Sequence, residues 1–215
     1  MLLPSQNSLR GVAAQGWKIA TRVGPSAIAG AGNGRFALEA AAQGTRLSCK
    51  PIISMSSIES LATIRADNVL AFERKQDLDK YIKLNVDGGH SRQSVLEVIE
   101  HFVWSLDGQR ACLCASTWSM NHADENTSNV LNVHKAIVDN AVVGEALIDI
   151  AEGDELCNNY RDFLMPEFYT AFCAEHGFLD VQSAVLAAIE STTRSRTSSD
   201  ATEHTATHYT GRAAK

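Results

Sequence analysis

Residues 119–130 read SMNHADENTSNV and stand between an apolar, cysteine-containing run (111–118) and a strand-like run (130–138). Asn and Asp side chains hydrogen-bond to nearby backbone groups and so stabilise turns. A plain turn needs one or two such residues, whereas this stretch carries four: Asn121, Asp124, Asn126 and Asn129. Their density indicates a buried polar junction, in which amides satisfy backbone groups that no sheet ladder reaches. An ordinary surface loop is the alternative when the stretch is taken alone.

Two further stretches bear on that choice. Residues 26–37 read SAIAGAGNGRFA, with a glycine at every second position from Gly30 to Gly34. Glycine offers no side chain to a packed strand, but it permits a ligand to approach the main chain closely. The alternative is a flexible hairpin tip. Residues 146–160 read ALIDIAEGDELCNNY, in which a Gly-Asp-Glu-Leu turn precedes Tyr160.

Taken in order, Gly-x-Gly-x-Gly-x-Phe-Ala, an Asn-His pair followed by a further Asn, and Gly-Asp-Glu-Leu ahead of a tyrosine resemble the SET-domain protein lysine methyltransferases. Each motif alone is weak, because glycine-rich loops are common, and the order and spacing carry the resemblance over roughly residues 17–162. It implies a mainly β fold with a few helices (α+β) of the β-clip kind, built from small curled sheets. It also implies a pseudo-knotted C-terminal segment, which ends in Tyr160 and threads beneath a loop.

The resemblance implies S-adenosyl-L-methionine as the cofactor and assigns a role to each matching position. The methionine and sugar portions would be held by the main chain around four residues: Gly30, Ala31, Gly32 and Asn33. Asn121 would hydrogen-bond the cofactor, while the His122 backbone would reach the adenine and its side chain would brace the loop. Asn129 would lock the threaded junction. Tyr160 matches the catalytic tyrosine, whose hydroxyl would lie beside the sulfonium and the incoming amine; a packed aromatic is the alternative.

The sequence departs from the family pattern at several positions. Ala123-Asp124 stands where many members have Ser-Cys. Asn158 occupies the specificity position two residues before the tyrosine, where Phe or Tyr is common, so the number of methyl groups added is not predicted. The cysteine-rich zinc tail of many histone methyltransferases is missing, and Phe163 and later aromatic residues either close the site in its place or pack in the core. A catalytically inactive SET module that binds a peptide or partner is therefore an alternative, and a β-rich structural protein with accidental motifs is a third reading.

Composition and charge narrow the class of protein. The 215 residues are 45% hydrophobic and 20% charged, within the globular range, and the formal net charge is −6. An acidic surface argues against direct nucleic-acid binding and would attract a basic, Lys-containing protein segment, of which a histone tail is one possibility. No apolar run approaches the length of a membrane span, so no membrane partner is expected. The oligomeric state is not predicted.

Cysteine usage bears on location and on metals. Five cysteines without a secretory signal predict a reduced, intracellular protein, nuclear or cytoplasmic. Cys112 and Cys114 are two residues apart in a predicted strand, so both side chains point to the same face. We expect them to be buried apolar groups, and we expect no metal site.

The chain divides into four predicted parts. These are a loose leader (1–14), a SET domain (15–162) with a helical insert at about 55–106, a C-terminal helical extension (163–190) and a disordered tail (191–215). Capping-box patterns predict helices over about 56–64 and from Ser94. Strands are predicted over 130–139 and 142–150, and a further helix opens near Pro166 and ends at Gly177. Residues 67–93 receive no clear assignment.

Overall fold

The computed structural model describes residues 16–28, 30–114, 120–123, 130–184 and 186–187. The predicted leader (1–14), the predicted tail (191–215) and the junction residue Asn129 lie outside these ranges, as does Asp124. None of the helices found within them combines the length and apolar character that a membrane crossing requires.

The described chain is mainly β, as predicted, and its strands form one ten-stranded sheet. The strands are β1 (Thr21–Pro25), β2 (Asn33–Ala37), β3 (Arg46–Ser54), β4 (Val69–Phe72), β5 (Val103–Trp104), β6 (Ala111–Cys114), β7 (Asn121–His122), β8 (Val133–Val138), β9 (Ala141–Ala146) and β10 (Glu155–Asn158). Their order is β1-β2-β10-β8-β9-β3-β4-β6-β5, and β7 pairs with β10 off this path. Most pairs are antiparallel, whereas β3–β4, β10–β7 and β10–β8 are parallel.

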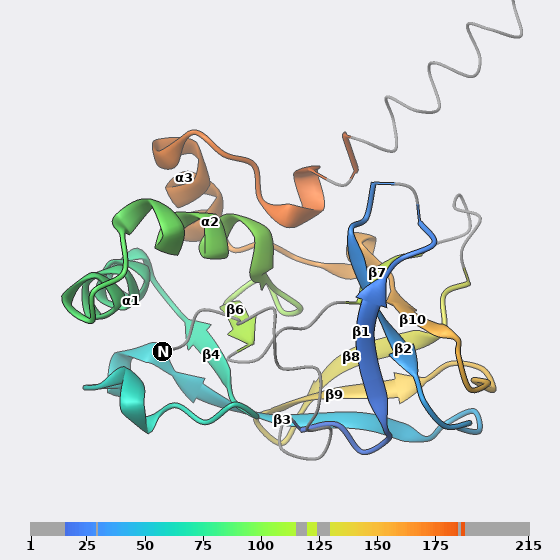
Figure 1. Ribbon diagram of the computed structural model, residues 1–215. Coiled ribbons are helices and arrows are strands. Elements are labelled where there is room, and N and C mark those ends of the chain that lie inside the picture. The colour runs from blue at the N-terminus through green and yellow to red at the C-terminus, as the bar shows by residue number, and fades with distance from the viewer. Residues whose placement is uncertain (1–15, 29, 115–119, 124–129, 185, 188–215) are drawn as a thin grey trace, which may run out of the picture.

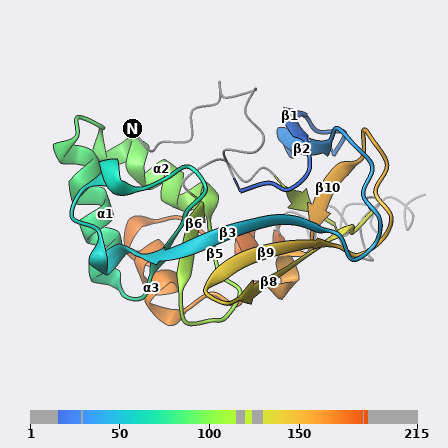
Figure 2. The ribbon, with the colours of Figure 1, turned by 90° about the horizontal axis from the view of Figure 1, so that it is seen from below.

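The helices are α1 (Lys75–Asp87), α2 (Arg92–Phe102) and α3 (Glu167–His176), with short 3₁₀ segments η2 (Met55–Ser57), η3 (Leu61–Thr63) and η4 (Tyr160–Asp162). Figures 1 and 2 show the three helices gathered at one end of the molecule and β1, β2 and β10 at the other, with β3, β8 and β9 running between them. One hydrophobic cluster lies under the helices and includes Tyr81, Ile99 and Phe172. A second lies beneath β10 and includes Met120, Val133 and Leu156.

β10 is the strand that brings distant parts of the chain together. Its first residues pair antiparallel with β2, with Leu156 opposite Arg35. Its last residues pair in parallel with β7, where Cys157 lies opposite Asn121, and with β8. A strand near the C-terminal end thus lies between the N-terminal hairpin and the polar stretch that follows β6. This is the arrangement expected for a C-terminal segment threaded between earlier parts of the fold.

The β8–β9 hairpin is present, but its second strand ends before the predicted end at Ile150. The turn residues are Asp139 and Asn140, both with left-handed backbone angles (φ 47° and 55°), which suit a two-residue hairpin turn. β9 ends at Ala146 instead of Ile150, because the chain leaves the ladder there and only Ile150 returns, in an isolated bridge to Ala41.

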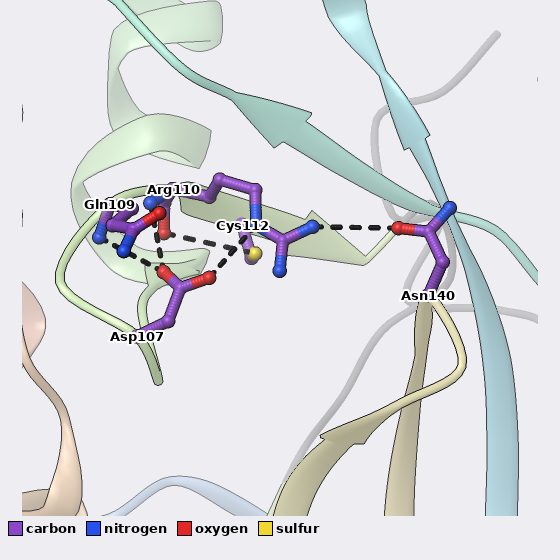
Figure 3. A network of polar contacts seen from close by, with 5 residues as sticks. All are labelled: Asp107, Gln109, Arg110, Cys112 and Asn140. Atoms are coloured by element: carbon purple, nitrogen blue, oxygen red, sulfur yellow. Dashed lines mark hydrogen bonds and ion pairs between the residues drawn. The ribbon is translucent and has the colours of Figure 1, made fainter.

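A polar network fastens this hairpin turn to the loop before β6 (Figure 3). The Asp107 carboxylate accepts hydrogen bonds from the Gln109 and Arg110 backbone N–H groups at 3.0 and 2.9 Å and from Arg110 Nε at 2.8 Å. The held guanidinium donates to Asn140 Oδ1 at 3.4 Å, and Asn140 Nδ2 donates to the Ile52 carbonyl at 3.1 Å. The turn is therefore tied both to the loop before β6 and to strand β3.

The helices only partly follow the prediction. The helix predicted over 56–64 is wrong: the segment forms the two turns η2 and η3, separated by extended backbone at Ile58. α2 begins one turn earlier than predicted, because Ser91 and not Ser94 is the N-cap, and its hydroxyl accepts from the Ser94 N–H at 3.1 Å. α3 agrees with the prediction and ends at Gly177, whose φ of 76° is the left-handed conformation of a helix C-cap. α1 was not predicted.

Candidate active site

Tyr160 is held at two points by the polar stretch of the sequence. It opens η4, where its backbone N–H donates to His122 Nδ1 at 3.0 Å and its hydroxyl donates to the Met120 carbonyl at 2.7 Å. The two rings lie 5.5 Å apart. Burial raises the pKa of the Tyr160 phenol, and the neighbouring Cys157 raises it further, so the hydroxyl remains a neutral donor over the physiological range.

Asn121 connects the same stretch to the glycine-rich loop. Its side-chain Nδ2 donates to Glu155 Oε1 at 2.7 Å and to the Asn33 carbonyl at 3.3 Å. The same carboxylate accepts from the Ser26 hydroxyl at 2.9 and 3.0 Å. A Cβ at Gly34 would lie only 2.6 Å from Glu155 Cδ, so a side chain there would displace this carboxylate from its hydrogen bonds with Ser26 and Asn121.

The first two glycines of the loop have a different role. Gly30 and Gly32 have φ angles of 79° and 69°, and a Cβ built at either residue meets nothing within 4 Å. The Ser26 N–H donates to the Gly32 carbonyl at 2.9 Å and so closes the loop. Ala31 is half-buried, whereas Asn33 is exposed. The main chain at Gly30 and Gly32 therefore borders open space, in the backbone conformation that favours glycine.

Asn132 locks β10 to the start of β8 and is a residue that the sequence motifs missed. Its Nδ2 donates to the Glu155 carbonyl at 2.8 Å, and its Oδ1 accepts from the Cys157 N–H at 2.8 Å. The side chain is 4% exposed. The prediction gave the junction role to Asn129, which lies outside the described residues. The available signal was a lone amide inside an otherwise strand-like run.

Asn158, the predicted specificity residue, is buried two positions before Tyr160. Its backbone carbonyl accepts from the Ala123 N–H at 3.2 Å. Its side-chain Oδ1 is buried and accepts no hydrogen bond from the described residues. An unmet buried acceptor costs about 1–3 kcal/mol, so a donor from a ligand, a water or a residue outside the described ranges would stabilise it.

An aromatic wall adjoins the tyrosine. The Phe163 ring stacks on Tyr160 with centroids 5.0 Å apart and planes at 22°, and it lies 6.1 Å from the Trp104 ring. Lys135 Nζ lies 5.2 Å from the Trp104 centroid and 5.4 Å from the Phe163 centroid. Of the aromatic residues after Tyr160 considered from sequence, Phe163 therefore lies at the site, whereas Tyr169 packs in the core under the helices.

Cys112 and Cys114 are both buried in β6. Burial raises the pKa of the Cys112 thiol to about 12 and also raises that of Cys114, so both thiols are protonated near neutral pH. Among the described residues, no three His, Cys, Asp or Glu side chains gather as metal ligands would.

Comparison with known proteins gives structural likenesses only. No family model and no curated protein matches the sequence. Apo ctPRC2 in an autoinhibited state is 18% identical over 74% of this chain, with a TM-score of 0.45. ctPRC2 in an autoinhibited conformation bound to S-adenosylmethionine is 17% identical over 74%, with a TM-score of 0.43. This chain spans 17% of the length of each.

The methyltransferase domain of human PR domain-containing protein 2 is also similar. It is 15% identical over 74% of this chain and 88% of that domain, with a TM-score of 0.36.

Proposed function

We propose that this protein transfers a methyl group from S-adenosyl-L-methionine to a lysine side chain of a protein. One observation carries the proposal: residues 120–122 contact both the glycine-rich loop and the tyrosine. Asn121 bonds the loop through the Asn33 carbonyl, while Met120 and His122 fix the hydroxyl and the backbone of Tyr160. A ligand lying along the loop would therefore end beside the phenol.

The residues present fit the cofactor. When bound, S-adenosyl-L-methionine supplies an activated methyl group on a sulfonium. The open main chain at Gly30, Ala31, Gly32 and Asn33 would hold its methionine and sugar portions, since no side chain stands at the two glycines. The Asn121 amide, whose Nδ2 is engaged by the loop and by Glu155, would offer its carbonyl oxygen to the cofactor. The His122 backbone would face the adenine.

The chain's own groups would prepare the lysine amine. An ordinary lysine has a pKa of about 10.4 and must lose its proton before it can accept a methyl group. The Phe163 and Trp104 rings form an apolar wall beside Tyr160, and such surroundings favour the neutral amine. The phenol oxygen, which keeps acceptor capacity while donating to Met120, would orient the amine, and Asn158 Oδ1 would accept one of its hydrogens.

The charge of the chain supports a basic substrate. A net charge of −6 favours a Lys-containing, positively charged protein segment over a nucleic acid or an anionic membrane. A histone tail is one member of this class. We place the reaction inside the cell, in the nucleus or cytoplasm, because the five cysteines are all free thiols.

Cofactor binding can be tested with two matched glycine variants. Gly32→Ala and Gly44→Ala both place a Cβ at a left-handed residue (φ 69° and 78°) with nothing within 4 Å, so each should lose about 1 kcal/mol of stability. Gly44 lies in a different turn, bonded to Ala146. Calorimetric titration with S-adenosylhomocysteine should show at least about tenfold weaker binding only for Gly32→Ala. A flat titration of the folded wild type, or equal losses in both variants, would refute the cofactor site.

Transfer can be tested with radiolabelled cofactor and a panel of histones. We expect incorporation into lysine by the wild type and a loss of about 100-fold or more in Tyr160→Phe, whose affinity for S-adenosylhomocysteine should be retained. Asn158, in place of an aromatic residue, favours one other function: a catalytically inactive module that binds a peptide or partner. That function predicts peptide binding without incorporation.

A further inference from the structure

Lys135 is a lysine on the inward face of a strand. In β8, Val133 is buried, His134 is exposed and Lys135 is buried again, so the pleat directs the lysine into the protein. It is 8% exposed. Lysines are rarely buried, because removing the amino group from water is costly.

Its amino group lies against two aromatic rings. The distances from Lys135 Nζ to the centroids of Trp104 and Phe163 are 5.2 and 5.4 Å, within the range of about 6 Å at which a cation is attracted to a ring face. The two rings are 6.1 Å apart and inclined by 31°. An ammonium at this position attracts both rings and so opposes rotation of either one.

Phe163 passes this restraint to the tyrosine. Its ring is stacked on Tyr160 at 5.0 Å, and its backbone N–H donates to the Tyr160 carbonyl at 3.2 Å, closing η4. The Tyr160 hydroxyl is held at its far end by the Met120 carbonyl. The Phe163 ring, which Lys135 contacts, is therefore one of the restraints on the phenol, together with the Met120 carbonyl and the His122 ring.

We propose that Lys135 is a positioning residue for Tyr160, whose amino group holds the Phe163 ring against the tyrosine and so sets the phenol for methyl transfer. This proposal rests on the function proposed above, because its effect on kcat can be measured only if the protein transfers methyl groups. It adds a charged group that acts through Phe163 and does not touch the substrate.

The charged and titratable groups around Lys135 make this restraint depend on pH. Among the described residues these are Cys114 on β6 and Lys50 on β3, with Arg35 on β2 next to both. Burial, opposed by Cys114 and aided by Lys50, lowers the pKa of Lys135 to about 7. The amino group is thus charged below about pH 7 and neutral above it, and the attraction to the rings fades as pH rises through 7.

The test compares wild type, Lys135→Arg and Lys135→Met in steady-state transfer to a histone peptide between pH 6 and 9. At pH 6 we expect kcat of Lys135→Met to be about fivefold below wild type, with KM within about twofold. At pH 8.5 the kcat values of the wild type and of Lys135→Met should be equal, because the wild-type amine is then neutral. Lys135→Arg, which keeps its charge, should restore kcat at pH 6 and exceed Lys135→Met at every pH.

A second measurement does not depend on turnover. In a background with Trp17 and Trp118 replaced by Phe, the fluorescence of Trp104 should change with a midpoint near pH 7, and Lys135→Met should abolish that transition. The role of Lys135 would be overturned if the ratio of the wild-type kcat to the Lys135→Met kcat did not change with pH. It would also be overturned if the Trp104 fluorescence showed no transition near pH 7. Absence of transfer by the wild type at every pH would instead overturn the proposed function.

Discussion

Replacing Lys135 by Met should stabilise the fold at neutral pH, because methionine fills a similar volume without an amino group to bury. Burial is the main cause that lowers the pKa of this lysine from 10.5 to about 7. Each pH unit between these values corresponds to about 1.4 kcal/mol, so the folded state bears a cost of about 5 kcal/mol at pH 7. Loss of the attraction to Trp104 and Phe163 offsets about 1–2 kcal/mol of the gain. We expect Lys135→Met to be about 3 kcal/mol more stable.

The sign of the pH dependence follows from linkage. Between about pH 7 and 10.5 the unfolded chain binds a proton at Lys135 that the folded chain does not bind. The wild type therefore gains stability as pH rises through this window, whereas Lys135→Met lacks this contribution. The advantage of the variant should be full at and below pH 7 and should be lost progressively towards pH 10.

Urea denaturation at pH 6.5, 7.5, 8.5 and 9.5, followed by circular dichroism, measures both free energies of unfolding. Lys18→Met, at an exposed position, is the control and should change stability by less than about 0.5 kcal/mol at every pH. A variant that is less stable than the wild type at pH 7.5, or a difference that does not vary with pH, would refute the reasoning. A difference independent of pH would mean that the pKa of Lys135 is not lowered by folding, and a less stable variant would mean that the lysine's contacts outweigh the cost of burying its charge.

Two other predictions concern the contacts that β10 makes with β2 and with the start of β8. Gly34→Ala should lose about 2 kcal/mol of stability in thermal unfolding, because the new Cβ meets the Glu155 carboxylate. The control is Gly24→Ala, directly opposite in register, whose Cβ meets only the end of an exposed arginine and which should lose less than about 1 kcal/mol. Equal losses would contradict the steric account. Asn132→Ala should cost about 2 kcal/mol of stability and should speed hydrogen exchange at the Cys157 amide about tenfold or more, because it removes the acceptor of that amide. Unchanged exchange would show that another group holds β10.

The family resemblance predicted the fold class, and hydrophobic patterning predicted some of its elements but not all. The β8–β9 hairpin and α3 follow from strand-like runs and from a glycine in the left-handed conformation. α1 was missed because its buried face includes Asp77 and Asn85, which interrupt the apolar pattern. Both have a partner one turn away: Asp77 Oδ2 accepts from the Glu73 N–H, and Asn85 Nδ2 donates to the Tyr81 carbonyl, although Asn85 Oδ1 accepts no hydrogen bond from the described residues. A pattern that counts apolar residues cannot detect such compensation.

The site shows the same division between local and non-local information. Glycine spacing and the Asn-His pair identified residues that the fold brings together around β10. Their catalytic roles stay predictions. Glu155, Asn132 and Lys135 were not singled out, because their partners are decided by which strands pair. Glu155 meets Ser26 from 129 positions earlier in the chain. Such contacts depend on topology, which single-sequence periodicity does not contain.

The place of β10 between β2, β7 and β8 has a consequence for biosynthesis. The ribosome synthesises the N-terminal hairpin and the central strands before β10, the strand that joins them. Until residues 155–160 have been synthesised, no strand lies between the β1–β2 hairpin and β7. Leu156 and Val133, which belong to one hydrophobic cluster, cannot yet pack together. We therefore expect the contacts of Asn121, Asn132 and Glu155 to form only after β10 has been synthesised, because these contacts join segments far apart in sequence.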